Sequence, residues 1–346
     1  MTRKRLRLLA VVGAACLALT GAGAVAIAQV AMTPGQQGTW CPQGAFVEGD
    51  AGCTKTTWPT PSTVTETVTE TVTVAPTTTT TTTVPPTTTT TTTPPVAPVV
   101  GSDAWKATTG LTSPEASLTV VNGNLTTTSN GQVIDGKKVT GNLVVQHDNV
   151  VVTNTRIQGV VQGSNLRGLT LRHVDLGLNS CPGSTNGGTR LINAGNYTLE
   201  SSRLHHNGAD LVNLAAGTIT MRDSWLGQTC YYNGDHLDAI QMYNPGQNVT
   251  LLVERSYLDS RAVNGSNLLG NGAVFIADNP GAGSNFVFKN NLFAGGNYTT
   301  AFYDSSHFEV RDNKYVAGSF RYGACDSTDT ITFTGNTLDT GAAVTC

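Results

Sequence analysis

From about residue 150 onward, apolar and polar positions repeat along the chain with a long period. Each repeat reads apolar, variable, apolar, then mostly polar or small residues, and ends on an aromatic or aliphatic residue. The repeats begin at Val150, Leu169, Tyr197, Ile219, Leu251, Phe286, Phe308 and Ile331. A period of about 22 residues with occasional insertions is typical of stacked β-coils. No segment with helical periodicity separates the repeats, so the pattern predicts an all-β solenoid.

Two columns of this alignment are polar and predict contacts between neighbouring coils. The sixth position holds Ser202, Ser224, Ser256, Asn291, Asn313 and Asn336, which can hydrogen-bond from coil to coil as a polar ladder. The fourth position holds Arg172, Glu200, Arg222, Glu254, Lys289 and Arg311, whose charges mostly alternate in sign. Strands about 4.8 Å apart make such side chains neighbours. We interpret both columns as structural and exclude them from the candidate site.

A second strand follows the first one in each coil, and its polar residues are the candidate chemistry. Three of these phrases begin at Arg190, Asp210 and Asp238. They align with Ile192, Val212 and Ile240 inward and with Asn193, Asn213 and Gln241 outward. Asp210 and Asp238 then lie one coil apart, close enough to repel and to raise the pKa of one of them. Such a pair suits glycoside hydrolysis, and its oxygens also suit a calcium ion.

Long insertions fall at one corner of the solenoid, between the end of the first strand and the core residue of the second. They run from Leu176 to Ile192, from Leu226 to Ile240 and from Leu258 to Phe275. Loops on one edge of a rigid solenoid commonly carry function. We therefore expect a groove that has His205, His206, Asp210, His236 and Asp238 in or near its floor.

Aromatic and amide side chains at the same corner favour a sugar ligand. Rings such as Trp225, Tyr231 and Tyr232 can pack on the C–H faces of sugars, and the amides of Asn213 and Gln241 can bond to hydroxyl groups. Structural alternatives stay open for these candidates. Asp238 or His236 can cap the bend before the strand, Asp210 can pair with Arg190, His205 can be a solvated turn histidine, and Trp225 can belong to plain surface packing.

The N-terminal part differs in composition from the repeats. Residues 1–31 have a basic start and a long apolar run, which predicts a signal peptide or an N-terminal membrane anchor. Residues 32–53 form a short cysteine-containing segment, and residues 54–100 are a linker rich in Thr and Pro that cannot build a core. The repeats occupy residues 101–346. We expect a protein that is secreted or tethered to the outer face of the membrane.

Charge and cysteines support this interpretation. The net charge of -3 gives no reason to expect nucleic acid as a partner, and the N-terminal segment is the only expected membrane contact. One cysteine, Cys16, lies in the apolar run, and an even number remains for disulfides in an exported chain. By proximity we pair Cys41 with Cys53, Cys181 with Cys230, and Cys325 with Cys346, although sequence alone allows other pairings.

The coil period, the Asn ladder and the phrase from Val133 to Gly141 resemble the right-handed parallel β-helix proteins of the pectate-lyase-like superfamily. The phrase from His236 to Gln241, His-x-Asp-x-Ile-Gln, is most similar to the secreted actinobacterial type. The resemblance covers about residues 101–346. It implies a right-handed parallel β-helix, but it does not fix an activity, because that superfamily holds lyases, hydrolases, epimerases and adhesins.

Two functions follow as hypotheses. The first is an extracellular polysaccharide lyase or glycoside hydrolase that acts around Asp210, His236 and Asp238, with Arg190 or His205 assisting. The second is a non-catalytic adhesin or glycan-binding module on a stalk. Both have a polysaccharide or cell-surface glycan as the partner. They differ in whether the acidic and histidine side chains share one groove.

Overall fold

The computed structural model describes residues 97–346 except 164–166, 183–188, 233–235, 243–245, 265–268, 278–280, 282, 304–306 and 329. The expected signal or anchor segment, the 32–53 segment with its Cys41–Cys53 pair, and most of the linker lie outside these residues. Within the part of the chain that the structure describes, no helix is both long and apolar enough to cross a membrane.

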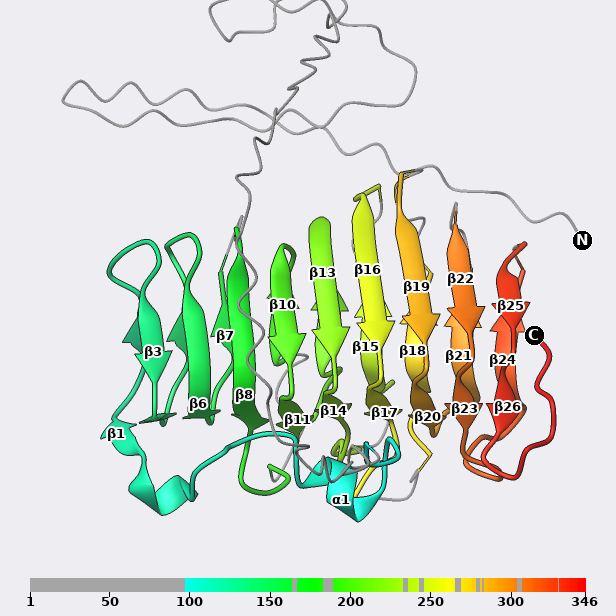
Figure 1. The fold of residues 1–346 in the computed structure, drawn as a ribbon, viewed down its shortest axis with the longest axis horizontal. Helices are drawn as coiled ribbons and strands as arrows, with labels where there is room; N and C mark the ends of the chain where they lie inside the picture. Colours follow the sequence, from blue (N-terminus) through cyan, green and yellow to red (C-terminus); the bar gives the residue numbers. More distant parts are fainter. Residues whose placement is uncertain are drawn as a thin grey trace, which may run out of the picture. The chain divides into compact units, whose positions relative to one another are not determined.

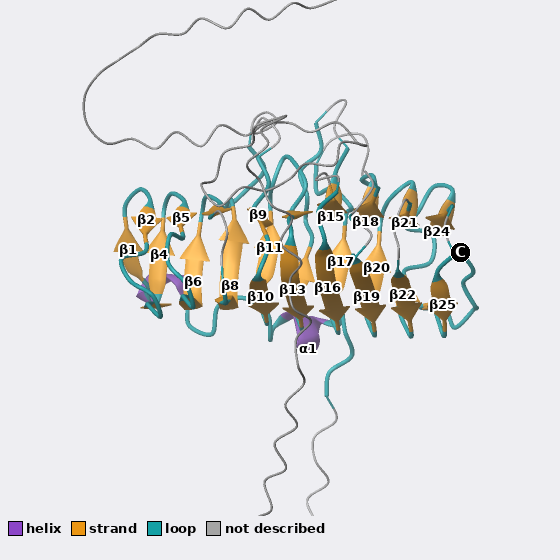
Figure 2. Ribbon diagram, turned by 90° about the horizontal axis from the view of Figure 1, so that it is seen from above, coloured by secondary structure: helices purple, strands orange, loops and turns teal. Residues whose placement is uncertain are grey.

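Residues from Thr119 onward form a parallel β-helix whose coils stack along its long axis (Figures 1 and 2). The sheet that we call the first sheet holds β1 (Thr119–Val121), β3 (Val133–Asp135), β4 (Lys137–Val139), β6 (Val151–Ile157), β8 (Leu169–Gly177), β10 (Tyr197–Glu200), β11 (Arg203–His205), β13 (Gly217–Arg222), β14 (Trp225–Leu226), β16 (Val249–Glu254), β17 (Tyr257–Asp259), β19 (Asn285–Lys289), β20 (Leu292–Ala294), β22 (Phe308–Arg311), β23 (Lys314–Tyr315), β25 (Thr332–Thr334) and β26 (Thr337–Leu338). The second sheet holds β2 (Leu125–Thr126), β5 (Leu143–Val144), β7 (Val161–Gln162), β9 (Ile192–Ala194), β12 (Val212–Leu214), β15 (Asp238–Met242), β18 (Gly272–Ile276), β21 (Tyr298–Phe302) and β24 (Gly323–Ser327).

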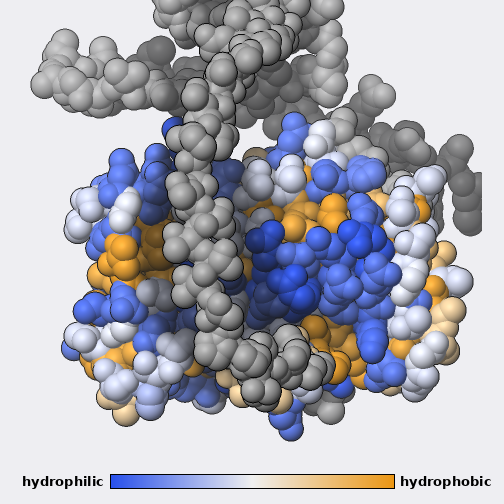
Figure 3. All heavy atoms as spheres, viewed as in Figure 1, coloured by the Kyte–Doolittle hydropathy of each residue, from blue (hydrophilic) through white to orange (hydrophobic). Residues whose placement is uncertain are grey.

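The register of the first sheet confirms the predicted repeat. Tyr197 pairs with Leu169 on one side and Ile219 on the other, and the same column continues through Leu251, Phe286 and Phe308. The inward residues of these coils are buried and form one continuous hydrophobic core. The outward charges pair between coils as expected, for example Arg172 with Glu200 at 3.0 Å and Lys289 with Glu254 at 2.9 Å. Figure 3 shows hydrophilic side chains gathered over the middle of this face.

The corner within the first sheet combines a backbone bend with the polar ladder. The residue before each ladder position has a positive φ, for example 47° at Ser201, 49° at Asp223 and 57° at Asp312, a conformation that bends the chain sharply. The ladder differs in one detail from the predicted side-chain pairing. The backbone N–H of each ladder residue donates to the side-chain oxygen of the next coil, as from Ser256 to Asn291 at 2.9 Å. Only Asn–Asn steps add a bond between side chains.

The second sheet confirms the alignment of the candidate phrases. Val212 pairs with Ile192 and Ile240, and Asn213 pairs with Asn193 and Gln241. One coil further, the expectation that Phe275 is the core residue is wrong. Val274 pairs with Ile240, while Phe275 pairs with Gln241 and faces outward. A shift of one residue moves a side chain to the opposite face of a strand, so Phe275 joins the outer surface.

Residues 97–118 run back along the outside of the first sheet. The short helix α1 (Asp103–Lys106) buries Trp105 against Tyr257 and Ala294, and it lies beside β14 and β17 in Figure 1. The chain then passes Ser201, whose carbonyl accepts from Gly110 N–H. Past the 3-10 turn η1 (Glu115–Ser117), it enters β1. This N-terminal strap covers part of the face that carries Trp225.

Candidate functional site

The predicted acidic pair exists and begins the strands of the second sheet. The backbone N–H of Asp238 donates to Oδ1 of Asp210 at 3.1 Å, and Arg190 Nε donates to Oδ2 of Asp210 at 3.3 Å. Asn271 donates its side-chain amide to both oxygens of Asp238, at 3.0 and 3.2 Å. Asn297 donates in turn to Oδ1 of Asn271 at 3.3 Å. The register of the strands therefore assembles a polar column across five coils.

Both carboxyl groups hold their protons more tightly than usual. Burial raises the pKa of Asp210 to about 6, although Asp238 N–H and Arg190 act in the opposite direction. Burial raises the pKa of Asp238 well above its ordinary range, and the charge of Asp210 raises it further. The expected repulsion is therefore present, but loss of hydration is the larger cause.

Accessibility separates the members of this column. Asp238 is 0% exposed and Asp210 is 3% exposed, whereas His236 is exposed. Asp238 thus cannot touch a ligand in this conformation. Its hydrogen bonds with Asn271 and Asp210 instead stabilise the start of β15. Asp210 contacts Arg190, whose side chain is partly exposed, so this pair is nearer to the surface.

The predicted outward amides form a row across three coils. Asn213 donates its side-chain amide to Oδ1 of Asn193 at 3.3 Å, and Gln241 follows one coil further. Asn193 is exposed, while Asn213 and Gln241 are 4% and 3% exposed. Oε1 of Gln241 is buried without a hydrogen-bond partner among the residues that the structure describes. Buried amide oxygens are usually satisfied, so this unpaired acceptor is an exception in the described part of the fold.

His205 does not join the acidic pair. It ends β11 in the first sheet, where its Nε2 lies 2.7 Å from Oδ1 of Asp175 and its Nδ1 lies 2.6 Å from Nδ1 of His206. Asp210 precedes β12 in the second sheet. The candidate residues therefore form two clusters at opposite ends of the segment from His205 to Asp210, rather than the floor of a single groove.

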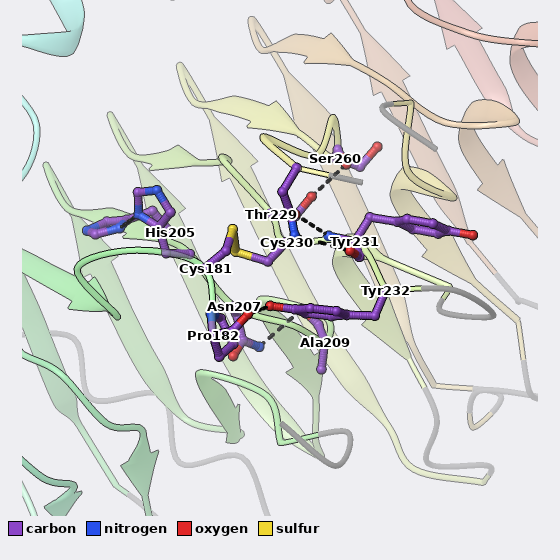
Figure 4. The surroundings of a disulfide bond; sticks show 12 residues. Cys181, Pro182, His205, Asn207, Ala209, Thr229, Cys230, Tyr231, Tyr232 and Ser260 are labelled. Carbon is purple, nitrogen blue, oxygen red and sulfur yellow. Dashed lines mark hydrogen bonds between the residues drawn. A yellow bond between two sulfur atoms is a disulfide. The ribbon is translucent and has the colours of Figure 1, made fainter. Parts of the chain in front are cut away.

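A disulfide ties the loops around that segment together, as predicted. Cys181 and Cys230 are bonded, and Figure 4 shows them between His205 and Tyr232. Tyr232 donates its hydroxyl to the carbonyl of Pro182, so its polar end links the same two loops. Tyr231 is half-buried, and its backbone N–H donates to Oδ1 of Asn264 at 2.8 Å. The second predicted disulfide, Cys325–Cys346, is also formed.

Trp225 lies on the first sheet and packs against the protein itself. Its ring stacks on Tyr257 with the centroids 6.4 Å apart, and Lys106 of α1 lies over both rings. Arg203 lies 4.9 Å from the same ring. The N-terminal strap thus packs against Trp225. This contact favours the surface-packing alternative over sugar contact for Trp225.

The structure reveals an aromatic cluster that the sequence pattern did not indicate. Tyr298 and Tyr322 have ring centroids 5.7 Å apart, and Phe275 and Tyr303 have ring centroids 6.0 Å apart. We call these four residues the aromatic cluster. They come from β18, β21, β24 or the residues beside these strands, all on the second sheet. The sequence could have indicated this cluster only through the spacing of Phe275, Tyr298 and Tyr322 from Asp238. Interpreting that spacing requires the correct strand register.

The donor set around the acidic pair does not fit calcium. Calcium takes six to eight oxygen ligands, whereas Arg190 occupies one carboxylate and Asn271 presents its N–H groups to the other. No group of at least three His, Cys, Asp or Glu side chains is arranged for a metal within the described residues. We therefore derive no step through a metal ion.

Comparison with known proteins adds no family assignment. No protein-family model matches the chain, and no curated protein matches its sequence significantly. The parallel β-helix is therefore established by the fold itself, while the superfamily remains a resemblance.

Proposed function

We propose that this protein is an extracellular glycan-engaging β-helix that binds a polysaccharide across the outer face of the second sheet. The observation that carries the proposal is the aromatic cluster, two ring pairs contributed by successive coils of the second sheet or by residues beside its strands. Regularly spaced coils suit a linear ligand made of repeating units, because each unit can meet an equivalent position on the next strand. The N-terminal composition supports an exported protein.

The aromatic cluster has the features of a sugar platform. Tyr322 is 66% exposed, so its ring is open to solvent. Gly323 lies directly beside Tyr298, since a Cβ at Gly323 would lie 3.2 Å from two ring atoms of Tyr298. A glycine there lets the tyrosine ring lie close to the strand. Aromatic faces pack on the C–H faces of sugars, and the tyrosine hydroxyls remain near water.

Polar groups for sugar hydroxyls border the same cluster. Tyr303 donates its hydroxyl to Oδ2 of Asp326 at 2.5 Å, which leaves the second carboxylate oxygen as an acceptor. Ligand sites typically combine apolar rings with a few such polar groups.

Catalysis is the second candidate function, and one observation favours it. Asp210 has a pKa raised to about 6 and lies two residues before β12 of the second sheet. A carboxyl group with such a pKa can act as a general acid near neutral pH. A polysaccharide lyase or glycoside hydrolase is therefore consistent with the proposed ligand, whereas a binding module would need no such group.

Replacing Tyr322 or Tyr298 by alanine should weaken glycan binding about tenfold or more, because truncation of an aromatic anchor commonly costs more than about 1 kcal/mol. Binding is measured with the full chain on a panel of immobilised acidic and neutral polysaccharides. The control is Val133→Ala, a similarly exposed residue on the first sheet. Equal affinity of all three variants for a bound glycan would overturn the proposed face.

A further inference from the structure

A relay of hydrogen bonds joins the buried carboxyl group of Asp238 to the aromatic cluster. Asn271 donates its side-chain amide to both oxygens of Asp238, at 3.0 and 3.2 Å, and Asn297 donates its amide to Oδ1 of Asn271 at 3.3 Å. The carbonyl of Asn297 then accepts the backbone N–H of Tyr322 at 2.8 Å. The relay therefore ends at the Tyr298–Tyr322 pair, which we assign to the glycan.

The backbone holds the two asparagines of the relay in line. The N–H of Asn271 donates to the carbonyl of Leu237 at 2.9 Å, and the N–H of Asn297 donates to the carbonyl of Asn271 at 2.7 Å. Gly296 has a φ of 103°, and a Cβ there would lie 2.8 Å from the carbonyl oxygen of Asn271. This close approach favours glycine. The main chain around Asn297 is therefore fixed, and the relay changes through its side-chain amides.

Ionisation of Asp238 sets the direction of these amides. An ionised carboxylate only accepts hydrogen bonds, and its bonds with N–H donors such as the Asn271 amide are charge-assisted. Oδ1 of Asn271 then faces Asn297 and accepts its amide, which is the arrangement in the structure. In this state each hydrogen bond of the relay joins a donor to an acceptor.

A protonated Asp238 carries an O–H donor that needs an acceptor. Oδ1 of Asn271 becomes that acceptor when its amide turns over, but its N–H groups then face the N–H groups of Asn297. The hydrogen bond between the two asparagines is lost. Burial, helped by the charge of Asp210, raises the pKa of Asp238, so this neutral form persists to a higher pH than for an ordinary aspartate.

The charged groups around the relay lie at its two ends. Among the described residues they are Asp210, Arg190 and His236 at the end of Asp238, and Arg321 and Asp326 at the end of Tyr322. Asp210 and Asp238 repel each other, so they titrate as a coupled pair. The two asparagines between these ends carry no charge. They transmit the orientation of an amide rather than a proton.

We propose that Asn271 and Asn297 are positioning residues, which make the glycan affinity of the Tyr298–Tyr322 pair depend on the ionisation of Asp238. This assignment rests on the proposed glycan function and deepens it. The aligned relay supports Tyr322 beside Tyr298, so affinity is higher when Asp238 is ionised and falls as Asp238 takes up its proton. The expected change is about three- to tenfold, the equivalent of one neutral hydrogen bond.

The test measures binding of the full chain to the same panel of immobilised polysaccharides between pH 4 and 8. Asn297→Leu removes the amide but keeps a similarly branched side chain, so it should bind about three- to tenfold more weakly at the upper pH. Asn297→Gln, which restores an amide, should regain part of this affinity. The matched control is Asn142→Leu. Asn142 also precedes a strand of the second sheet and accepts from the next coil, at Val160, but it lies several coils from the aromatic cluster.

Asp238→Asn keeps a neutral side chain at every pH and isolates the effect of this carboxyl group. Its glycan affinity should vary less with pH than that of the unsubstituted protein. Nuclear magnetic resonance of isotope-labelled tyrosine reports the same change without a glycan and shows that each variant is folded. The ring signals of Tyr298 and Tyr322 should shift with pH in the unsubstituted protein and shift less in Asp238→Asn.

These measurements separate the relay from the proposed function. Equal pH dependence of the ring signals in Asp238→Asn and the unsubstituted protein, or unchanged glycan affinity in Asn297→Leu, would overturn the relay and leave glycan binding standing. Absence of binding to every polysaccharide would overturn the proposed function, and the ring signals would then decide the relay alone.

Discussion

Replacing Asn313 by alanine is expected to lower the free energy of unfolding by about 3 kcal/mol or more. Asn313 is fully buried in the ladder, and its Oδ1 accepts from both the backbone and the side-chain amide of Asn291. Its Nδ2 donates to the carbonyl of Phe288 and to Asn336. Alanine would leave several buried polar groups unpaired at once, and each such group costs about 1–3 kcal/mol.

Chemical denaturation of the full chain, followed by a probe of its β structure, measures this loss. Lys314→Ala is the matched control because Lys314 is the next residue and is exposed. A loss for Asn313→Ala no larger than that for Lys314→Ala would show that the ladder contributes little to stability. It would also imply that water replaces the missing amide.

The Asp238→Asn variant is expected to become increasingly more stable than the unsubstituted protein as the pH rises through the folded-state pKa of Asp238. Asp238 is fully buried, and its pKa is raised by burial and by Asp210. The folded state therefore binds its proton more tightly than the unfolded state. The contribution of Asp238 is favourable below its unfolded pKa and is lost as pH rises through its folded pKa.

The difference between the two proteins removes the contributions of titrating groups that do not interact with Asp238. The lowered pKa values of His205 and His206 act in the opposite direction, since the unfolded state then binds more protons and stability rises with pH. These terms cancel in the comparison of variant with unsubstituted protein. Between pH 4 and 8, the denaturation midpoints of Asp238→Asn and of the unsubstituted protein should move apart as the pH rises. Asp103→Asn, which replaces an exposed side chain, should keep a constant difference from the unsubstituted protein. A constant or shrinking difference would contradict the buried-carboxyl interpretation.

Much of the fold could be predicted because every coil repeats the same stabilising contacts. Each coil buries the same apolar positions and stacks the same ladder position, so columns such as Tyr197–Ile219–Leu251 appear directly in the sequence. The same argument placed Asp210 beside Asp238 and Asn213 beside Gln241. Register fails where insertions interrupt the period. For this reason the sequence pattern placed Phe275 in the core column, whereas Val274 occupies it.

The site was harder to predict because its contacts depend on segments without a repeat. Trp225 is paired with α1, a segment more than a hundred residues earlier, and nothing in the periodicity indicates that contact. Asp175 occupies an ordinary outward position in its strand and gains its role only from His205 in the next coil. Burial of Asp238 likewise depends on how the chain around it packs, which alternation along one strand cannot reveal.

Oxidative footprinting of the full chain, with and without a glycan that binds, most directly tests the claim that the second sheet is the binding face. We expect Tyr322 and Tyr298 to lose reactivity in the presence of the glycan, while Trp225 on the first sheet does not change. Protection of Trp225 and its neighbours without any change at Tyr322 and Tyr298 would contradict the account and place the ligand on the opposite face.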